Sequence, residues 1–263
     1  MRKMMLAFLL ALGPWGNVAG QASHSLAGHY VVLDPGHGGL DPYGSGRCLP
    51  GDQWMVREHN LANVVLRLVK AGLEAQGATV AESVRDTSFL GFTYYPCTKV
   101  PWLDGQTVYA DGRPAEYSAE GLRKRVAPAN SLVARFGQKR VAYLAIHFGW
   151  EVPGCQGSFL VIPSNGPSRL ANKLLESLAR HGQLRQLVDK SCPAFFRNGG
   201  SNYQRVIRVL RHDESPVINR VILEVANLAN DEDFTVVSGP EFGRLAQSMA
   251  DAVVEAFVLW ARR

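Results

Sequence analysis

Four polar residues in this chain occupy positions from which side chains could do chemistry. His37 follows a short β-branched run, in a glycine-rich turn that leaves its side chain free to reach a ligand. His147 directly follows a second apolar run, and Glu224 interrupts a third. Glu58 opens a predicted helix 21 residues after His37, which would bring a carboxylate back over the same edge. Two imidazoles and two carboxylates are therefore predicted to meet at one place.

This combination of side chains is typical of hydrolytic zinc sites. Three protein ligands, here His37, Glu58 and His147, would leave a fourth position for water. Zinc lowers the pKa of that water and polarises a carbonyl oxygen. A second carboxylate that does not bind the metal must then take the proton and pass it to the leaving amine. Glu224 is our candidate for this role, because a carboxylate in an apolar strand is costly unless it is paired or faces a site.

Each assignment has a structural alternative. The two histidines are equally well explained as ordinary residues, one in a glycine-rich loop and one at a strand end. Glu224 could instead form an ion pair with Arg220. His59 competes with Glu58 as a ligand, and only one of them can face a metal because adjacent helical residues point about 100° apart. The remaining histidines are predicted to lie at the surface: His24, His29, His181 and His212.

The elements that must position these residues alternate between strand and helix. Alternation of this kind is typical of a single α/β domain, with a mostly parallel twisted sheet of roughly six strands and helices on both faces. Sites in such sheets gather at the carboxyl ends of the strands. Strands are predicted at residues 30–33, 78–84, 141–146, 157–162, 205–210 and 217–225, and helices begin near Arg57, near Leu122, after Pro167 and after Ser238.

Some segments interrupt this pattern. Residues 87–118 and 182–203 are rich in Gly, Pro and aromatic residues and are predicted to be irregular insertions outside the core layers. Pro128 is expected to kink the helix in which it lies or to mark a new start. Ser238 and Glu241 form a capping-box pattern for the final helix.

The first 22 residues have the three parts of an export signal: basic Arg2 and Lys3, an apolar run, and small residues before a cleavage point. We therefore expect a mature catalytic domain over 23–263, exported to the periplasm or the extracellular space, with no membrane anchor. An oxidising compartment permits disulfides. Four cysteines allow three full pairings, which the sequence leaves open: Cys48, Cys97, Cys155 and Cys192.

Composition places the chain among ordinary globular proteins, with 46% apolar and 19% charged residues in 263. The formal charge of +5 falls to +3 if the two basic residues of the export signal are removed. The remaining basic residues are dispersed and no aromatic residues are interleaved with them, so a nucleic-acid partner is not indicated. We expect a monomer.

The same residues carry a resemblance to a known family. The run 31–39 with Asp41-Pro42, Glu58 opening a helix, Ala145-Ile146-His147, and Leu223-Glu224-Val225 with Asn230 following resemble the zinc-dependent N-acetylmuramoyl-L-alanine amidases of bacterial cell walls. The match runs from Tyr30 to Phe257.

The resemblance implies a single catalytic domain in which His37, Glu58 and His147 hold one zinc ion and Glu224 is the catalytic carboxylate. It implies hydrolysis of the amide between the lactyl group of N-acetylmuramic acid and the L-alanine of the stem peptide, in peptidoglycan or muropeptides. Whether a protein partner activates the chain stays open. Further matching positions are predicted to serve helix–sheet packing and a buried ion pair: Arg85-Asp86, Leu122, Arg125 and Ala129-Asn130.

The chain also departs from the family pattern. Ala145 replaces a serine, Phe148-Gly149-Trp150 replaces an alanine-asparagine pair, and Val225-Ala226-Asn227 replaces a glycine-aromatic pair. These changes put the substrate preference in question. Two alternatives therefore stay open: a wall-binding or regulatory protein that keeps zinc without turnover, and a related zinc peptidase that cuts within the stem peptide.

Overall fold

The structure, a computed structural model, describes most of the chain from residue 25 onward. The predicted export signal, His24, His212 and the predicted strand 205–210, apart from Leu210, lie outside the described residues, and Leu210 is not part of a strand. The described residues are 25–38, 46–51, 54–87, 89, 91–92, 94–97, 107–109, 111–116, 118–149, 155–183, 194–197, 210–211 and 215–262.

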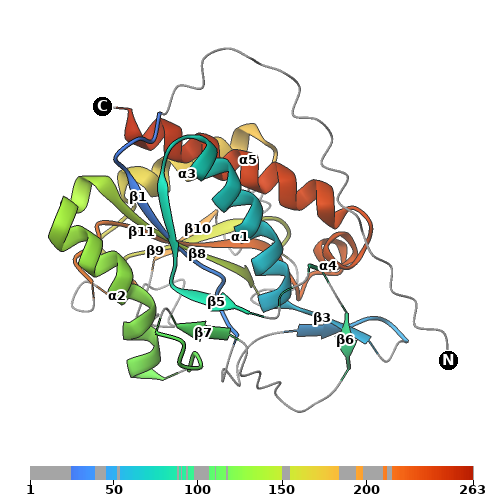
Figure 1. Ribbon diagram of the computed structural model, residues 1–263. Helices are drawn as coiled ribbons and strands as arrows, with labels where there is room; N and C mark the ends of the chain where they lie inside the picture. Colours follow the sequence, from blue (N-terminus) through green and yellow to red (C-terminus); the bar gives the residue numbers. More distant parts are fainter. Residues whose placement is uncertain are drawn as a thin grey trace.

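A six-stranded sheet forms the centre of the molecule (Figure 1). Its order is β10-β9-β11-β8-β1-β4, and every neighbouring pair is parallel except β9 and β11. The predicted mostly parallel sheet is therefore confirmed. Its strands are β1 (Tyr30–Asp34), β4 (Thr79–Glu82), β8 (Val141–Gly149), β9 (Phe159–Ile162), β10 (Phe195–Arg197) and β11 (Asn219–Asn227).

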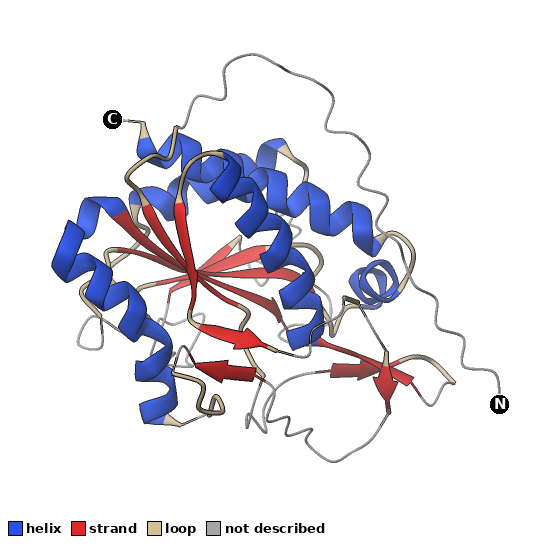
Figure 2. Cartoon of the chain, in the orientation of Figure 1, coloured by secondary structure: helices blue, strands red, loops and turns tan. Residues whose placement is uncertain are grey.

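Helices cover both faces of this sheet, as the sequence predicts (Figure 2). One face packs against α1 (Glu58–Ala75), α3 (Arg169–Arg180) and α5 (Phe242–Ala261), and the other against α2 (Ala119–Phe136). Two shorter helices are η1 (Gln138–Arg140) and α4 (Asp231–Ser238). Within the described part of the chain, none of the helices has both the length and the apolar character to cross a bilayer.

Alternation along β8 divides the core into two layers. Ala142, Leu144 and Ile146 pack with α1, α3 and α5, whereas Tyr143 and Ala145 pack with α2. This is the period of two that a strand imposes on side chains buried on both faces. Residues with odd numbers in β8 therefore belong to the α2 face.

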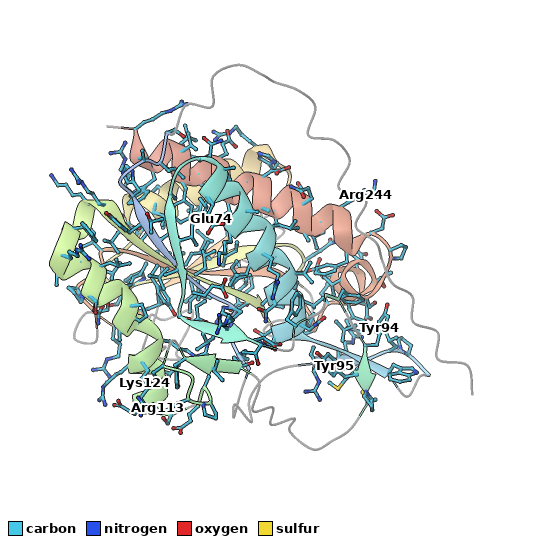
Figure 3. The ribbon with its side chains drawn as sticks, viewed as in Figure 1. Glu74, Tyr94, Tyr95, Arg113, Lys124 and Arg244 are labelled. Atoms are coloured by element: carbon cyan, nitrogen blue, oxygen red, sulfur yellow. A yellow bond between two sulfur atoms is a disulfide. The ribbon has the colours of Figure 1, made fainter. Side chains whose placement is uncertain are left out.

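Two small sheets lie beyond the carboxyl edge of the central sheet. One consists of β2 (Gly46–Cys48), β3 (Trp54–Arg57) and β6 (Tyr95–Pro96), and the other of β5 (Val84–Asp86) and β7 (Thr107–Tyr109). Figure 3 labels Tyr95 on β6 of the first of these sheets and Tyr94 directly before it. The described strands of the predicted insertion 87–118 thus pair outside the central sheet.

A disulfide joins Cys48 to Cys97, and so ties β2 to the end of β6 on either side of β3. Cys155 is also disulfide-bonded. The bond between Cys48 and Cys97 occurs in only one of the three full pairings that the sequence leaves open.

The predicted start of the last helix is wrong. Ser238 is the final residue of α4, and its hydroxyl donates to the carbonyl of Phe234 at 2.6 Å instead of capping α5. Glu241 occupies the N-cap of α5 without a side-chain hydrogen bond. The helix that the sequence analysis missed is capped by Asn230, which accepts hydrogen bonds from two backbone amides.

Other features also differ from the prediction. The predicted strand 78–84 divides at Ser83, so that its last residue belongs to β5 in a separate sheet. Pro128 lies inside α2 without dividing it. β10 lies within the segment 182–203, which was predicted to be irregular, and it completes the edge of the central sheet.

His29, which was predicted to lie at the surface, is partly buried, and its ring packs edge-on against Trp260 with 5.1 Å between ring centroids. Burial lowers the pKa of His29 below its ordinary value of 6.5. His181 is also partly buried, and its Nε2 lies 3.1 Å from a Glu255 oxygen.

The lowered pKa of His29 predicts loss of stability in acid. As the pH falls, the unfolded chain binds a proton at His29 before the folded chain does. The free energy of unfolding is therefore undiminished above pH 6.5 and decreases as the pH falls from 6.5 through the folded-state pKa. His29→Phe keeps the ring contact with Trp260 and removes the titration. Thermal midpoints measured at pH 8 and pH 5 should therefore fall less in the variant than in the wild type. Equal drops in both proteins would contradict the role of His29.

Removal of the Cys48–Cys97 bond should destabilise the protein. The bond closes a loop of 49 residues in the unfolded chain, and comparable disulfides contribute about 2–4 kcal/mol. The double variant Cys48→Ser/Cys97→Ser should show this loss of unfolding free energy in urea denaturation. An unchanged midpoint and slope would show that the bond contributes nothing.

Candidate metal centre

Three predicted side chains converge at the carboxyl edge of the central sheet. His147 Nδ1 lies 3.0 Å from Glu58 Oε1, and His37 Nε2 lies 3.5 Å from Glu58 Oε2. The two imidazoles meet edge to face, with 5.1 Å between ring centroids. Donor atoms from all three residues lie within 4.8 Å of one another, and no other such group of potential metal ligands occurs among the described residues.

This set of donors fits a zinc ion. Zinc is bound by histidine nitrogens and carboxylate oxygens at about 2.0–2.2 Å in a tetrahedral arrangement, which places neighbouring donors at separations like those seen here. Glu58 is only 2% exposed, so its carboxylate is buried between two imidazoles. Such a buried acid is stabilised by positive charge, which a divalent cation would provide.

Two glycines allow the loop that carries His37 to approach the sheet. Gly36 and Gly38 both have positive φ, at +73° and +103°. A Cβ on Gly36 would lie 2.9 Å from the Ile146 carbonyl oxygen and 3.0 Å from the ring of His147. A side chain at either position would therefore strain the backbone, and one at Gly36 would also displace a candidate ligand.

A buried carboxylate holds the start of this loop. Asp34 accepts hydrogen bonds from the Gly36 amide at 2.8 Å and from Arg125 at 2.8 Å on one oxygen. Its other oxygen accepts from the Ser83 hydroxyl at 2.5 Å and the Tyr143 hydroxyl at 2.9 Å. Burial raises the pKa of Tyr143 well above its ordinary value, which keeps that hydroxyl a donor.

Arg125 carries this network to the loop itself. It comes from α2, lies fully within the protein, and donates to the Gly36 carbonyl and to the His37 carbonyl, the latter at 3.3 Å. The predicted buried ion pair is thus the pair of Arg125 with Asp34. The sequence analysis missed Asp34 as its partner, although a carboxylate directly before the Pro-Gly turn was a usable signal.

Glu58 is held by the junction between β3 and α1. The strand runs directly into the helix, with Arg57 in extended conformation at the N-cap. A carboxylate in the first turn of a helix is favoured by the positive end of the helix dipole. Glu58 Oε1 also accepts the backbone amide of Phe148 at 3.2 Å, which links the helix to β8.

Glu224 lies beside His147 on the neighbouring parallel strand. The two residues are register partners in β11 and β8, where strands run about 4.8 Å apart. Both belong to the α2 face, since Ile222, two residues earlier, packs with α2. Glu224 is 5% exposed. The register shifts immediately beyond it, so Glu224 marks the end of regular pairing.

The alternative roles of Arg220 and His59 can be compared with the geometry. Arg220 donates to the carbonyls of Ser215 and Val217, which precede it in the chain. His59 is not part of the group of potential ligands and contacts β7, where its Nε2 lies 3.2 Å from the hydroxyl of Thr107. The structure thus brings Glu58, and not His59, beside His37 and His147.

Two of the departures from the family pattern lie away from these residues. The side chains of Phe148 and Val225 are buried in the layer formed with α1, α3 and α5, on the opposite face from His147 and Glu224. Asn227 donates to the Cys155 carbonyl at 2.7 Å. Its side-chain oxygen accepts the Ala229 amide at 3.1 Å, in the loop that follows β11. Trp150 lies outside the described residues.

Comparison with known proteins decides the family. Residues 31–255 match the family described as N-acetylmuramoyl-L-alanine amidase. The chain belongs to this amidase family. The matched residues span all four candidate positions, and the predicted resemblance to N-acetylmuramoyl-L-alanine amidases is confirmed. No curated protein matches it in sequence.

Solved structures share the fold of this amidase family member. Ami1 from Mycobacterium smegmatis is 21% identical with a TM-score of 0.57, and the match covers 90% of this chain and 98% of that one. The catalytic domain of CwlV from Bacillus (Paenibacillus) polymyxa var. colistinus is 17% identical with a TM-score of 0.55, and the match covers 88% of this chain and 97% of that one. CwlD from Clostridioides difficile, solved with the GerS lipoprotein, is 12% identical, TM-score 0.55, over 88% and 98%.

The Asp34 network predicts a large and specific loss of stability. Asp34→Ala would leave Arg125 buried without its carboxylate, which costs about 3–5 kcal/mol. The control is Glu82→Ala, which removes the partly exposed ion pair with Lys70 and should cost less than about 1 kcal/mol. Unfolding free energies measured in urea compare the two. Similar losses would show that the buried network does not hold the loop.

Proposed function

We propose that the protein is a zinc-dependent N-acetylmuramoyl-L-alanine amidase. It hydrolyses the amide between the lactyl group of N-acetylmuramic acid and the L-alanine of the stem peptide. The observation that carries the proposal is the convergence of His37, Glu58 and His147, with Glu224 in register beside the second histidine. Membership of the amidase family supports the choice of substrate.

Three residues hold the metal in this proposal, and a fourth moves the proton. His37 and His147 bind as neutral imidazoles and Glu58 as a carboxylate. Zinc, when bound, supplies the Lewis acidity that activates water and polarises the scissile carbonyl. Glu224 takes the proton of the attacking water and returns it to the leaving nitrogen of L-alanine. Its burial shields this proton transfer from bulk solvent.

The network behind the site holds the metal ligands in place for this reaction. Asp34 accepts the backbone amide of Gly36, and Arg125 donates to the carbonyl oxygens of Gly36 and His37 in the loop. The Phe148 amide fixes the orientation of the Glu58 carboxylate. Ligands held in this way lose little freedom when a metal binds, which favours tight binding.

We further propose that the protein acts on cell-wall peptidoglycan after export. The apolar segment near the amino terminus and the disulfide between Cys48 and Cys97 support an oxidising compartment. The complex of CwlD with a lipoprotein motivates a search for a protein partner. Activity of the purified protein alone would show that no partner is required.

Chelation should abolish activity on purified sacculi or muropeptides. The expected products are a free stem peptide with an L-alanine amino terminus and a glycan with intact lactyl carboxylates, both identified by mass spectrometry. Added zinc should restore the release. Cleavage between amino acids of the stem would identify a peptidase, and zinc-loaded protein without any release would contradict an amidase that acts alone.

Variants should separate metal binding from proton transfer. Glu224→Gln keeps the shape but not the basicity of the side chain, so it should retain zinc and lose about 10²–10⁴-fold in activity. His37→Ala should lose both zinc and activity, because it removes a ligand. Glu176→Gln, on the exposed surface of α3, is the matched control and should change neither. Normal turnover by Glu224→Gln would overturn the assigned role.

A further inference from the structure

A polar cluster lies next to Glu58 of the candidate metal centre, at the first turn of α1. It is formed by His59, Asn63, Asp86 and Thr107, which we call the His59 cluster. His59 Nε2 lies 3.0 Å from the Asn63 side-chain nitrogen, 3.2 Å from the Thr107 hydroxyl and 3.5 Å from an Asp86 oxygen. The side chains of His59 and Asp86 are only 12% and 9% exposed.

The His59 cluster joins two parts of the molecule that are distant in sequence. Asp86 and Thr107 are direct cross-strand partners in β5 and β7, so both act on His59 from one rung of the small sheet. His59 and Asn63 stand one turn apart on α1. The small sheet thus contacts the first turn of α1, immediately beside Glu58 (Figure 1).

The ring of His59 also covers the loop that carries His37. A Cβ placed on Gly38 would lie 2.4 Å from His59 Cε1 and 2.6 Å from Nδ1. This ring cannot swing aside freely, because the small sheet and Asn63 hold it. The loop is therefore in close contact with two histidine rings: Gly36 lies against His147, and Gly38 lies against His59.

We infer that His59 is a positioning residue that sets the place of His37 at the metal centre. The ring acts as a fixed support between the small sheet and Gly38, and His37 is the residue between the two supported glycines. The inference rests on the proposed metal site, but it adds a role for a side chain that binds no metal. It also makes β5 and β7 part of the support of the site.

Metal affinity provides the direct test. His59→Ala should weaken zinc binding about 10–100-fold, as is usual when a residue supporting a ligand is removed. Affinity is measured by competition with a chromophoric chelator, with no dependence on turnover. His181→Ala is the matched control, since it removes a partly buried histidine that also lies beside a carboxylate, at the end of α3. An affinity loss equal to that of the control would overturn the inference.

A double-mutant cycle tests the contact itself. Gly38→Ala introduces backbone strain in any background, but it meets the ring only when His59 is present. Gly38→Ala should therefore weaken zinc binding by about tenfold more in the wild type than in His59→Ala. Equal effects in the two backgrounds would show that the ring does not support the loop.

Two controls keep the outcomes distinct. The wild-type protein must bind zinc, and its failure to do so would overturn the proposed function and not merely the role of His59. Thermal unfolding of the metal-free proteins shows whether each variant folds. If His59→Ala does not fold, His59→Gln retains a polar group toward Asp86 and should fold with weakened zinc binding. Folded His59→Gln with wild-type affinity would overturn the inference.

Discussion

The buried ion pair between Asp34 and Arg125 is the constraint on which the site depends. Asp34 ends β1 in the central sheet, and its two oxygens accept four hydrogen bonds, one from the following loop and three from segments distant in sequence. Arg125 brings α2 to the same point and holds the loop backbone. A buried carboxylate and a buried guanidinium are tolerated only when their hydrogen-bonding groups are satisfied. The sheet, the helix and the loop must therefore come together as one unit.

The same principle of shared support extends across the metal centre. Glu58 belongs to α1, His147 to β8 and His37 to a loop, so no single element carries the site. The Phe148 amide holds Glu58 and Arg125 holds the loop of His37, and neither group contacts substrate in our proposal. This division explains why Phe148 can be large and apolar: its amide serves Glu58 while its side chain fills the core.

Periodicity in the sequence predicts the elements that bury a continuous apolar face. It identifies β1, β8, β9 and β11 and the helices α1, α2, α3 and α5, and the convergence of strand ends then brings His37, His147 and Glu224 to one edge. Segments without such a face escape prediction. α4 has only eight residues with an acidic first turn, and β10 has three residues.

Features that depend on distant pairings are equally hard to read from sequence. Spacing alone does not pair Cys48 with Cys97, and nothing local shows that His59 points toward Thr107. The parallel pairing of β8 with β11 places Glu224 opposite His147. Deleting one residue early in β11 would turn Glu224 toward the opposite layer, whereas extra residues in the connection before it would leave the rung intact. We therefore expect insertions and deletions to preserve the site only when they fall in the connections.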